Sequence, residues 1–430
     1  MLTTTIGLAP DRVKRAVPPV ATKPRPPVFL HTGWRSAGTW LWSRFRTLPS
    51  VVAYYEPLNP IVDALTPATL ASYSSDTWAS GHPSLEHAYF HEYGDLLRHA
   101  RPGIARFEPG FAVADFFAEA TADLPDLRAY IAMLNDHASS NHGRAVLKFC
   151  RSIGRVGWMQ RNFPDAAHVV IARNPAAQFS SARRQYARHA NPYFLAMPWL
   201  VLTHNRDDTR VAEALRCFDV QLPILPAHAS AATTDAVLRR HLSDTDPADW
   251  YRAFLAFWTL AALSIPETID CVIDSDLLTI SPRYRVASQR DLAALTGMPV
   301  ELGDEPHAIE PTAGIGIPRA AVWRCHQAAR ALVLARHGAA WVDTALGARI
   351  GAMLAQADLI AMDGHAALAA RSLDAIEGRD RLRLLAEDAQ QARVQVQREL
   401  DLVYASRSWK LTEPLRQIHT LVRPPATRGA

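Results

Sequence analysis

A glycine-containing turn close to the N-terminus has the residue types that hold phosphate groups. The segment HTGWRSAGTWLWSRF starts at His31 and passes from a short apolar stretch into a helical pattern. A turn of this kind directs backbone N–H groups and the start of a helix at one point, which creates a site for an anion. The residues that we expect to surround the anion are Gly33, Arg35, Ser36, Ala37, Gly38, Thr39 and Trp40. An ordinary tight turn with a capping serine is the alternative interpretation.

A second candidate for anion binding lies further along the chain. The apolar segment AHVVIA is followed by Arg173, Asn174 and Pro175, and then by a pair of serines, Ser180 and Ser181. An arginine at the end of a strand and a hydroxyl in the first turns of the next helix can bind the same phosphate, because the guanidinium offers two parallel donors and the helix start a favourable dipole. We expect Arg173 and one of these two serines to form such a clamp, although the pattern taken alone is common by accident.

Two classes of phosphate-binding protein compete for the first segment. Gly33 and Gly38 are separated by four residues, which is the Walker A spacing, so a P-loop kinase acting on a small molecule is one hypothesis. A Walker loop continues with lysine and then serine or threonine, which reach the phosphates and hold magnesium. This chain has Thr39 and Trp40 at those positions. The sequence therefore disfavours nucleoside-triphosphate chemistry and predicts no metal ion.

Both segments resemble motifs of one enzyme family. The first resembles the 5′-phosphosulfate loop, P-K-S-G-T-T-W-L, of sulfotransferases that use 3′-phosphoadenosine 5′-phosphosulfate (PAPS). Arg35 stands in place of the lysine, and Ala37 and Gly38 depart from the glycine and threonine of the family. The second resembles the family's 3′-phosphate motif, Arg-Asn-Pro and, after five residues, serine, at Arg173 and Ser181. The resemblance implies that PAPS is the donor substrate and is held at both ends. The departures leave a non-catalytic scaffold as a third hypothesis.

A further segment bears on the acceptor. Residues 55–58, YEPL, resemble the E-P-L segment of carbohydrate sulfotransferases. The resemblance implies a glycan or lipid-linked glycan as acceptor, with Glu56 as the base that takes the proton of its hydroxyl. His31 is the second candidate for the base. A strand-end glutamate paired with arginine, and a histidine satisfied in the core, are the structural alternatives. Arg151, which ends the segment KFCR, is a candidate for contact with nucleotide or substrate, or for a structural ion pair.

The implied reaction is an in-line displacement at sulfur. Arg35, helped by Ser36 and Thr39, would stabilise charge on the departing phosphate oxygens while Glu56 deprotonates the nucleophile. Positioning and electrostatic stabilisation would then account for most of the rate.

The elements that must position these residues alternate between strand and helix. Short apolar, β-branched runs bounded by turn residues indicate strands, and longer amphipathic runs between them indicate helices. Such alternation predicts an α/β fold with a parallel sheet covered by helices, in which ligands bind beyond the carboxyl ends of the strands. With the resemblance, this implies the P-loop-like sulfotransferase fold. The expected strands begin at Pro27, Val51, Ala145, Ala167 and Ile269.

Three regions are expected along the chain. Residues 1–26 are basic and proline-rich and are predicted to be a disordered arm, residues 27–319 form the sulfotransferase domain, and residues 320–430 form a helical region. The end of this region, from Tyr404, resembles the tail S-x-S-W-[RK]-L-T-x-P-L-R of bacterial glycosyltransferases that build surface glycans. A basic amphipathic tail of this type suits a membrane surface or a partner, or packs on its own domain. The long helix before it is a candidate for homo-oligomer contacts.

Composition excludes several classes of protein. The chain has 430 residues, of which 49% are hydrophobic and 20% charged, and these values are ordinary for a globular enzyme. A net charge of +4 is too small to argue for nucleic-acid binding. The four cysteines are scattered without a CxxC pair, so neither a disulfide framework nor a zinc site is expected. Without a signal-peptide core or an apolar run of about 18 residues, a cytoplasmic location is predicted, with the tail at the inner face of the membrane.

Overall fold

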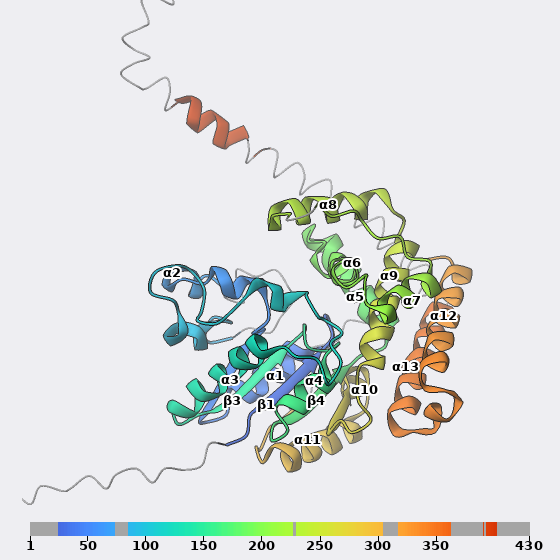
Figure 1. Ribbon diagram of the computed structural model, residues 1–430, viewed down its shortest axis with the longest axis horizontal. Helices are drawn as coiled ribbons and strands as arrows, with labels where there is room; N and C mark the ends of the chain where they lie inside the picture. Colours follow the sequence, from blue (N-terminus) through green and yellow to red (C-terminus); the bar gives the residue numbers. More distant parts are fainter. Residues whose placement is uncertain are drawn as a thin grey trace, which may run out of the picture.

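A five-stranded, all-parallel sheet forms the centre of the protein (Figure 1). The computed structural model describes residues 25–73, 85–226, 229–303, 317–362, 390 and 393–401. The strand order is β2-β3-β1-β4-β5, so that β1 lies in the middle. Each strand falls on a segment for which the sequence predicts one, and the expected α/β class with a helix-covered parallel sheet is confirmed. The strands are β1 (Val28–Thr32), β2 (Val51–Tyr55), β3 (Arg144–Phe149), β4 (Ala167–Ala172) and β5 (Cys271–Asp274).

Two hydrophobic clusters hold the helices in place. The first lies around β1, β2 and β3 and includes the buried faces of three helices, α1 (Gly38–Arg46), α3 (Pro125–Ser140) and α4 (Val156–Asn162). The shorter elements near these strands are η1 (Pro60–Ala64), α2 (Pro67–Leu70), η2 (His91–Leu96) and η3 (Pro109–Ala112). Next to β5 lie α10 (Ser275–Ile280) and α11 (Pro282–Thr296). The strands are therefore almost fully buried, as expected for a parallel sheet.

The second cluster is built mainly by helices that gather beside the sheet in Figure 1. Its members from the middle of the chain are α5 (Pro175–His189), α6 (Tyr193–His204), α7 (Thr209–Phe218), α8 (Ala231–Asp244) and α9 (Pro247–Leu263). It also takes in α12 (Arg319–His337), η4 (Ala339–Asp343) and α13 (Ala345–Met362). One continuous core thus runs across the boundary that the sequence predicts near residue 320.

The C-terminal helices are also tied to the rest by polar contacts. The hydroxyl of Tyr251 in α9 lies 2.6 Å from Nε2 of His326 in α12, and Nδ1 of the same ring lies 2.5 Å from Asp358 in α13. The guanidinium of Arg349 donates to the carbonyl of Val272 in β5. These bonds fix α12 against α9, and α13 against α12 and the sheet.

Parts of the chain on which the sequence makes predictions lie outside the described residues. These are the N-terminal arm up to residue 24, the tail from Tyr404, and most of the long helix before it, of which residues 393–401 are described and helical. None of the helices in the described ranges combines the length and the apolar content that a membrane span needs.

Candidate functional site

The residues singled out from the sequence gather at the carboxyl edge of the sheet. Gly33 follows β1, Glu56 follows β2, Arg151 lies just after β3 and Arg173 follows β4. Because all five strands are parallel, these strand ends share one edge, which is where α/β folds bind ligands.

The turn between β1 and α1 has an unusual backbone. Arg35 and Ala37 adopt positive φ angles of 66° and 64°, in the left-handed region that non-glycine residues seldom occupy. The Ser36 hydroxyl donates to the carbonyl oxygen of Gly33 at 2.7 Å and closes the turn. Ala37 is the N-cap of α1 and offers no side-chain acceptor to its first N–H groups. The start of this nine-residue helix is therefore available to an anion.

Neighbouring side chains approach both glycines of the turn so closely that a larger residue would collide with them. A Cβ added at Gly38 would lie 2.5 Å from the side chain of Thr32, and one added at Gly33 would lie 2.6 Å from Nε2 of Gln178. That Gln178 nitrogen donates to the carbonyl of Trp34 at 2.5 Å, so α5 supports the turn from behind. The turn is thus packed tightly against both β1 and α5.

Two other residues predicted to surround the anion, Thr39 and Trp40, lie in the first turn of α1 and are buried. The Thr39 hydroxyl lies 3.4 Å from the hydroxyl of Tyr55 at the end of β2. The Arg44 guanidinium lies over the Trp40 ring, with its carbon 5.5 Å from the ring centre. Thr39 therefore faces the neighbouring strand end, whereas Trp40 packs into the core.

An acidic residue that the sequence did not single out organises the turn after β4. Asp276, in α10, accepts from Arg173 Nε at 3.0 Å, from the Asn174 backbone N–H at 3.1 Å and from Asn174 Nδ2 at 2.8 Å. The Asn174 side chain in turn caps α5 by accepting the N–H of Ala177 at 2.8 Å. The indole N–H of Trp258 donates to the carbonyl of Arg173 at 3.1 Å. The sequence signal that could have pointed to Asp276 was the pair of aspartates in IDSDLL, where β5 ends and α10 begins.

The two predicted anion-binding segments touch each other. Arg35 Nε donates to the Ser181 hydroxyl at 3.1 Å, and Arg173 donates to the carbonyl of Arg35 at 3.1 Å. The second terminal nitrogen of Arg173 is buried and has no hydrogen-bond partner among the described residues. A buried guanidinium nitrogen of this kind is costly unless a ligand completes it, so the geometry suits an oxyanion.

Three guanidinium groups, Arg35, Arg173 and Arg184, make up what we call the arginine cluster. Burial, followed by the positive charges of Arg173 and Arg184, lowers the pKa of Arg35 to about 10. The Arg35 guanidinium also stacks over the ring of Phe194, 5.1 Å from its centre. Sequence reasoning missed Arg184, although its position three residues after Ser181 on a predicted helix was a usable signal.

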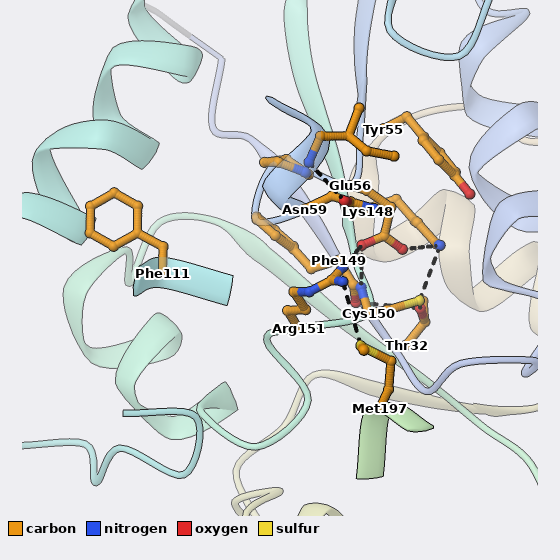
Figure 2. A network of polar contacts seen from close by, with 12 residues as sticks. Thr32, Tyr55, Glu56, Asn59, Phe111, Lys148, Phe149, Cys150, Arg151 and Met197 are labelled. Carbon is orange, nitrogen blue, oxygen red and sulfur yellow. Dashed lines mark hydrogen bonds and ion pairs between the residues drawn. The ribbon is translucent and has the colours of Figure 1, made fainter. Parts of the chain in front are cut away.

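A second group of charged side chains, the glutamate cluster, consists of Glu56, Lys148 and Arg151 (Figure 2). Lys148 Nζ donates to Glu56 Oε1 at 2.5 Å, and Arg151 lies 3.7 Å from Oε2. The backbone N–H of Cys150 donates to Oε2 at 3.1 Å. Strand pairing sets this contact, because Tyr55 lies opposite Lys148 and the Glu56 N–H donates to the Lys148 carbonyl at 2.9 Å. Sequence reasoning missed Lys148 as the partner of Glu56, although a charged residue within an apolar strand was a usable signal.

Two neighbouring cations keep the carboxylate of the glutamate cluster in its ionised form. Burial alone would raise the pKa of Glu56, but Lys148 and Arg151 outweigh it and hold that pKa below its ordinary value. Burial opposes the charge on Lys148 as well, yet Cys150 and Glu56 raise its pKa above the usual range. Arg151 also donates to the Tyr193 hydroxyl. Its Nε and one terminal nitrogen are buried and have no hydrogen-bond partner in the part of the chain that the structure describes.

His31, the second candidate for the base, is fully buried. Its Nδ1 lies 2.7 Å from the Ser152 hydroxyl and its Nε2 lies 3.1 Å from Nδ1 of His168. Burial and then the neighbouring His168 keep the pKa of His31 well below its ordinary value. Both ring nitrogens are thus engaged within the core, an arrangement that favours the structural alternative for this residue.

In the described part of the chain, no group of three or more His, Cys, Asp and Glu side chains is arranged to hold a metal ion. The arginine cluster has the geometry that could hold an oxyanion, and a buried carboxylate, Glu56, lies at another strand end of the same edge. No family model matches the chain, and comparisons with curated proteins and with solved structures found no match.

Proposed function

We propose that this protein is a sulfotransferase that moves a sulfuryl group from PAPS to a hydroxyl of a glycan or lipid-linked glycan. The observation that carries the proposal is the direct contact between the two predicted motifs, Arg35 to Ser181 and Arg173 to the carbonyl of Arg35. A nucleotide with phosphate groups at both its 5′ and 3′ positions needs cationic groups from two such segments. The sheet order, with a glycine-containing turn after the central strand, fits the P-loop-like sulfotransferase fold.

The donor would lie along the carboxyl edge of the sheet. The turn after β1 and the start of α1 would hold the 5′-phosphosulfate, with Arg35 and the hydroxyl of Thr39 beside it. Arg173 and Ser181 would bind the 3′-phosphate, and the buried, unpartnered nitrogen of Arg173 fits that role. Ser36 would act mainly through the backbone, since its hydroxyl is used to close the turn.

Transfer would proceed by in-line displacement. The acceptor oxygen forms a bond to sulfur as the bond from sulfur to the 5′-phosphate oxygen breaks, and the electron pair goes to that phosphate oxygen. Arg35 stabilises the charge that develops there. The reaction needs no metal ion, because the positive charge comes from side chains and backbone N–H groups.

Glu56 is the proposed acceptor of the hydroxyl proton. Its carboxylate is ionised and held rigidly, and each oxygen has a further lone pair beyond the one used by Lys148 or Cys150. Its lowered pKa makes it a weaker base than an ordinary glutamate. Most of the rate would therefore come from positioning and from stabilisation of the leaving phosphate. The choice of a glycan acceptor rests on the resemblance of Glu56-Pro57-Leu58 and of the tail.

The donor half of the proposal can be tested by calorimetry. Adenosine 3′,5′-bisphosphate, the product nucleotide, should bind the wild-type protein at micromolar concentration without magnesium. Arg173→Ala should weaken this binding by about 1.5–3 kcal/mol, the range for a charge-assisted hydrogen bond. ATP serves as the control ligand. Absence of bisphosphate binding, or equal binding of ATP, would contradict the assignment.

A further inference from the structure

Two buried arginines flank the turn that follows β3, and both carry nitrogens that the surrounding residues do not use. Arg151 and Arg155 are 2% and 1% exposed. The turn between them closes with a hydrogen bond from the Arg155 N–H to the carbonyl of Ser152, at 2.9 Å. Nε of each arginine and one terminal nitrogen of Arg151 are buried and have no hydrogen-bond partner among the described residues. Such N–H groups are rare in folded proteins and costly unless another group accepts their hydrogen bonds.

The protein engages only part of each guanidinium. One terminal nitrogen of Arg155 donates to the carbonyls of Phe111 and Ala114, both at 3.1 Å, and so ties the segment around η3 to the turn. The unpartnered terminal nitrogen of Arg151 lies 3.7 Å from Oε2 of Glu56, beyond hydrogen-bond reach (Figure 2). The carboxylate of Glu56 therefore leaves donors of Arg151 unused.

Buried positive charge exceeds buried negative charge around this turn. Lys148, Arg151 and Arg155 are buried cations, and Glu56 is the buried carboxylate that forms ion pairs with the first two. In the described part of the chain, no carboxylate lies within ion-pair distance of Arg155. Burial lowers the pKa of Arg155 to about 10. The charge of the exposed Asp115 opposes this shift and that of Arg151 adds to it. Arg155 therefore stays protonated at neutral pH, and the two guanidinium groups repel each other.

Aromatic rings and burial decide which kind of anion suits the two arginines. The Arg151 guanidinium lies over Trp34, 5.9 Å from the ring centre, and that of Arg155 lies over Phe116, at 5.7 Å. These two rings stack on each other, 6.2 Å apart. Opposite charges attract more strongly in such surroundings of low polarity than in water. Because the unpartnered nitrogens are closed to solvent, a charged group attached to a sugar or nucleotide does not reach them, whereas a free monatomic anion can enter through local opening.

We propose that Arg151 and Arg155 together bind a small inorganic anion, of which chloride is the type, at the end of β3. The anion accepts hydrogen bonds from the unpartnered nitrogens of both guanidinium groups and screens the repulsion between them. It thereby stabilises the turn after β3 and the segment that Arg155 holds through Phe111 and Ala114. The site shares no residue with the one proposed for PAPS, so it can be tested without any nucleotide.

Crystals of the wild-type protein grown in sodium bromide locate the anion directly. Bromide takes the place of chloride and is identified by its anomalous scattering. We expect an anomalous peak in contact with Nε of Arg151 and Nε of Arg155. Absence of a peak there would overturn the inference, and so would electron density without an anomalous signal, which identifies a water molecule.

Thermal unfolding measures what the anion contributes. Chloride replaces methanesulfonate at constant ionic strength, so that general screening stays the same. Once chloride exceeds its dissociation constant, each tenfold increase should raise the Tm of the wild type by about 2 °C. Arg155→Met removes one guanidinium and should abolish this dependence.

Arg161→Met is the matched control, because Arg161 is an exposed arginine in the last turn of α4. It should keep the full dependence on chloride. A wild type whose Tm does not respond to chloride, or an equal response in Arg155→Met, would overturn the inference. If Arg155→Met fails to fold, the bromide peak in the wild type decides the question alone.

Discussion

The arginine cluster and the glutamate cluster lie at the same edge of the sheet, yet they differ in how their charges are used. In the glutamate cluster two buried cations share one carboxylate, and the Glu56 oxygens already accept from Lys148 and Cys150. In the arginine cluster three cations meet, and Asp276 forms an ion pair with Arg173. The carboxylate of the first cluster is engaged by the protein, whereas the second cluster is the one at which we propose that the donor's phosphate binds.

One edge of the sheet can thus combine a rigid cluster of charges with a cluster suited to binding a ligand. A buried ion pair with short contacts fixes the ends of β2 and β3 and leaves little free energy to be gained from a ligand. In the arginine cluster the charges of Arg173 and Arg184 oppose that of Arg35, and a phosphate bound there, as we propose, would relieve that repulsion. Changes in the glutamate cluster should therefore affect stability first, and changes in the arginine cluster should affect binding first.

The largest expected effect is on stability and comes from Glu56→Gln. The neutral amide leaves the buried charges of Lys148 and Arg151 without their carboxylate, which should cost about 3–5 kcal/mol in the free energy of unfolding. Denaturant titration measures the loss. The control is Asp235→Asn, which breaks an exposed ion pair with Arg239 on α8 and should cost about 0.5 kcal/mol or less. Equal losses in the two variants would contradict a compensated buried cluster.

Glu56→Gln also bears on catalysis. If enough protein folds, it should bind adenosine 3′,5′-bisphosphate as the wild type does but no longer transfer sulfuryl groups, because the proton acceptor is gone. Retained transfer would reject Glu56 as the base. Adding Lys148→Met should recover part of the lost stability, since it removes one of the unpaired cations.

A smaller effect is expected from Gly38→Ala in the turn after β1. The new methyl group would lie 2.5 Å from Thr32, whose β-branched side chain has little freedom to move away. Overpacking of this kind costs about 1–3 kcal/mol in the free energy of unfolding. Gly33→Ala is the matched variant. Its new methyl group meets only the far end of the Gln178 side chain, which can move away. The expected loss in the free energy of unfolding, about 0.5–1.5 kcal/mol, is that of the hydrogen bond from Gln178 to the carbonyl of Trp34. A larger loss in Gly33→Ala than in Gly38→Ala would show that the turn packs differently.

The smallest expected effect is a pH dependence of stability. The folded-state pKa of Glu56 lies below its ordinary value of 4.5, so its ion pairs stabilise the fold above that value. This contribution is lost as the pH falls through the folded-state pKa. The difference in unfolding free energy between wild type and Glu56→Gln should therefore shrink between pH 6.5 and pH 3.5. A constant difference across this range would contradict an ionised Glu56.

Local sequence patterns were enough to predict the five strands and to place the candidate residues at the carboxyl edge of the sheet. The five strands were predicted because each is a short apolar run bounded by turn residues, and period and turn chemistry are local properties. The positions of Arg35, Glu56, Arg151 and Arg173 at strand ends followed from the same reasoning. Their common edge followed from parallel strands alone.

Tertiary structure decided which of these residues meet and what state each one takes. The pairing of Glu56 with Lys148 depends on the register between β2 and β3, which a linear pattern does not specify. The use of both His31 nitrogens depends on Ser152 and His168, far away in the chain. The sequence by itself predicted two anion-binding segments, one after β1 and one after β4. Only packing between distant segments decided that Arg35 touches Ser181 and that Asp276 holds Arg173, because burial and side-chain contacts are properties of the whole fold.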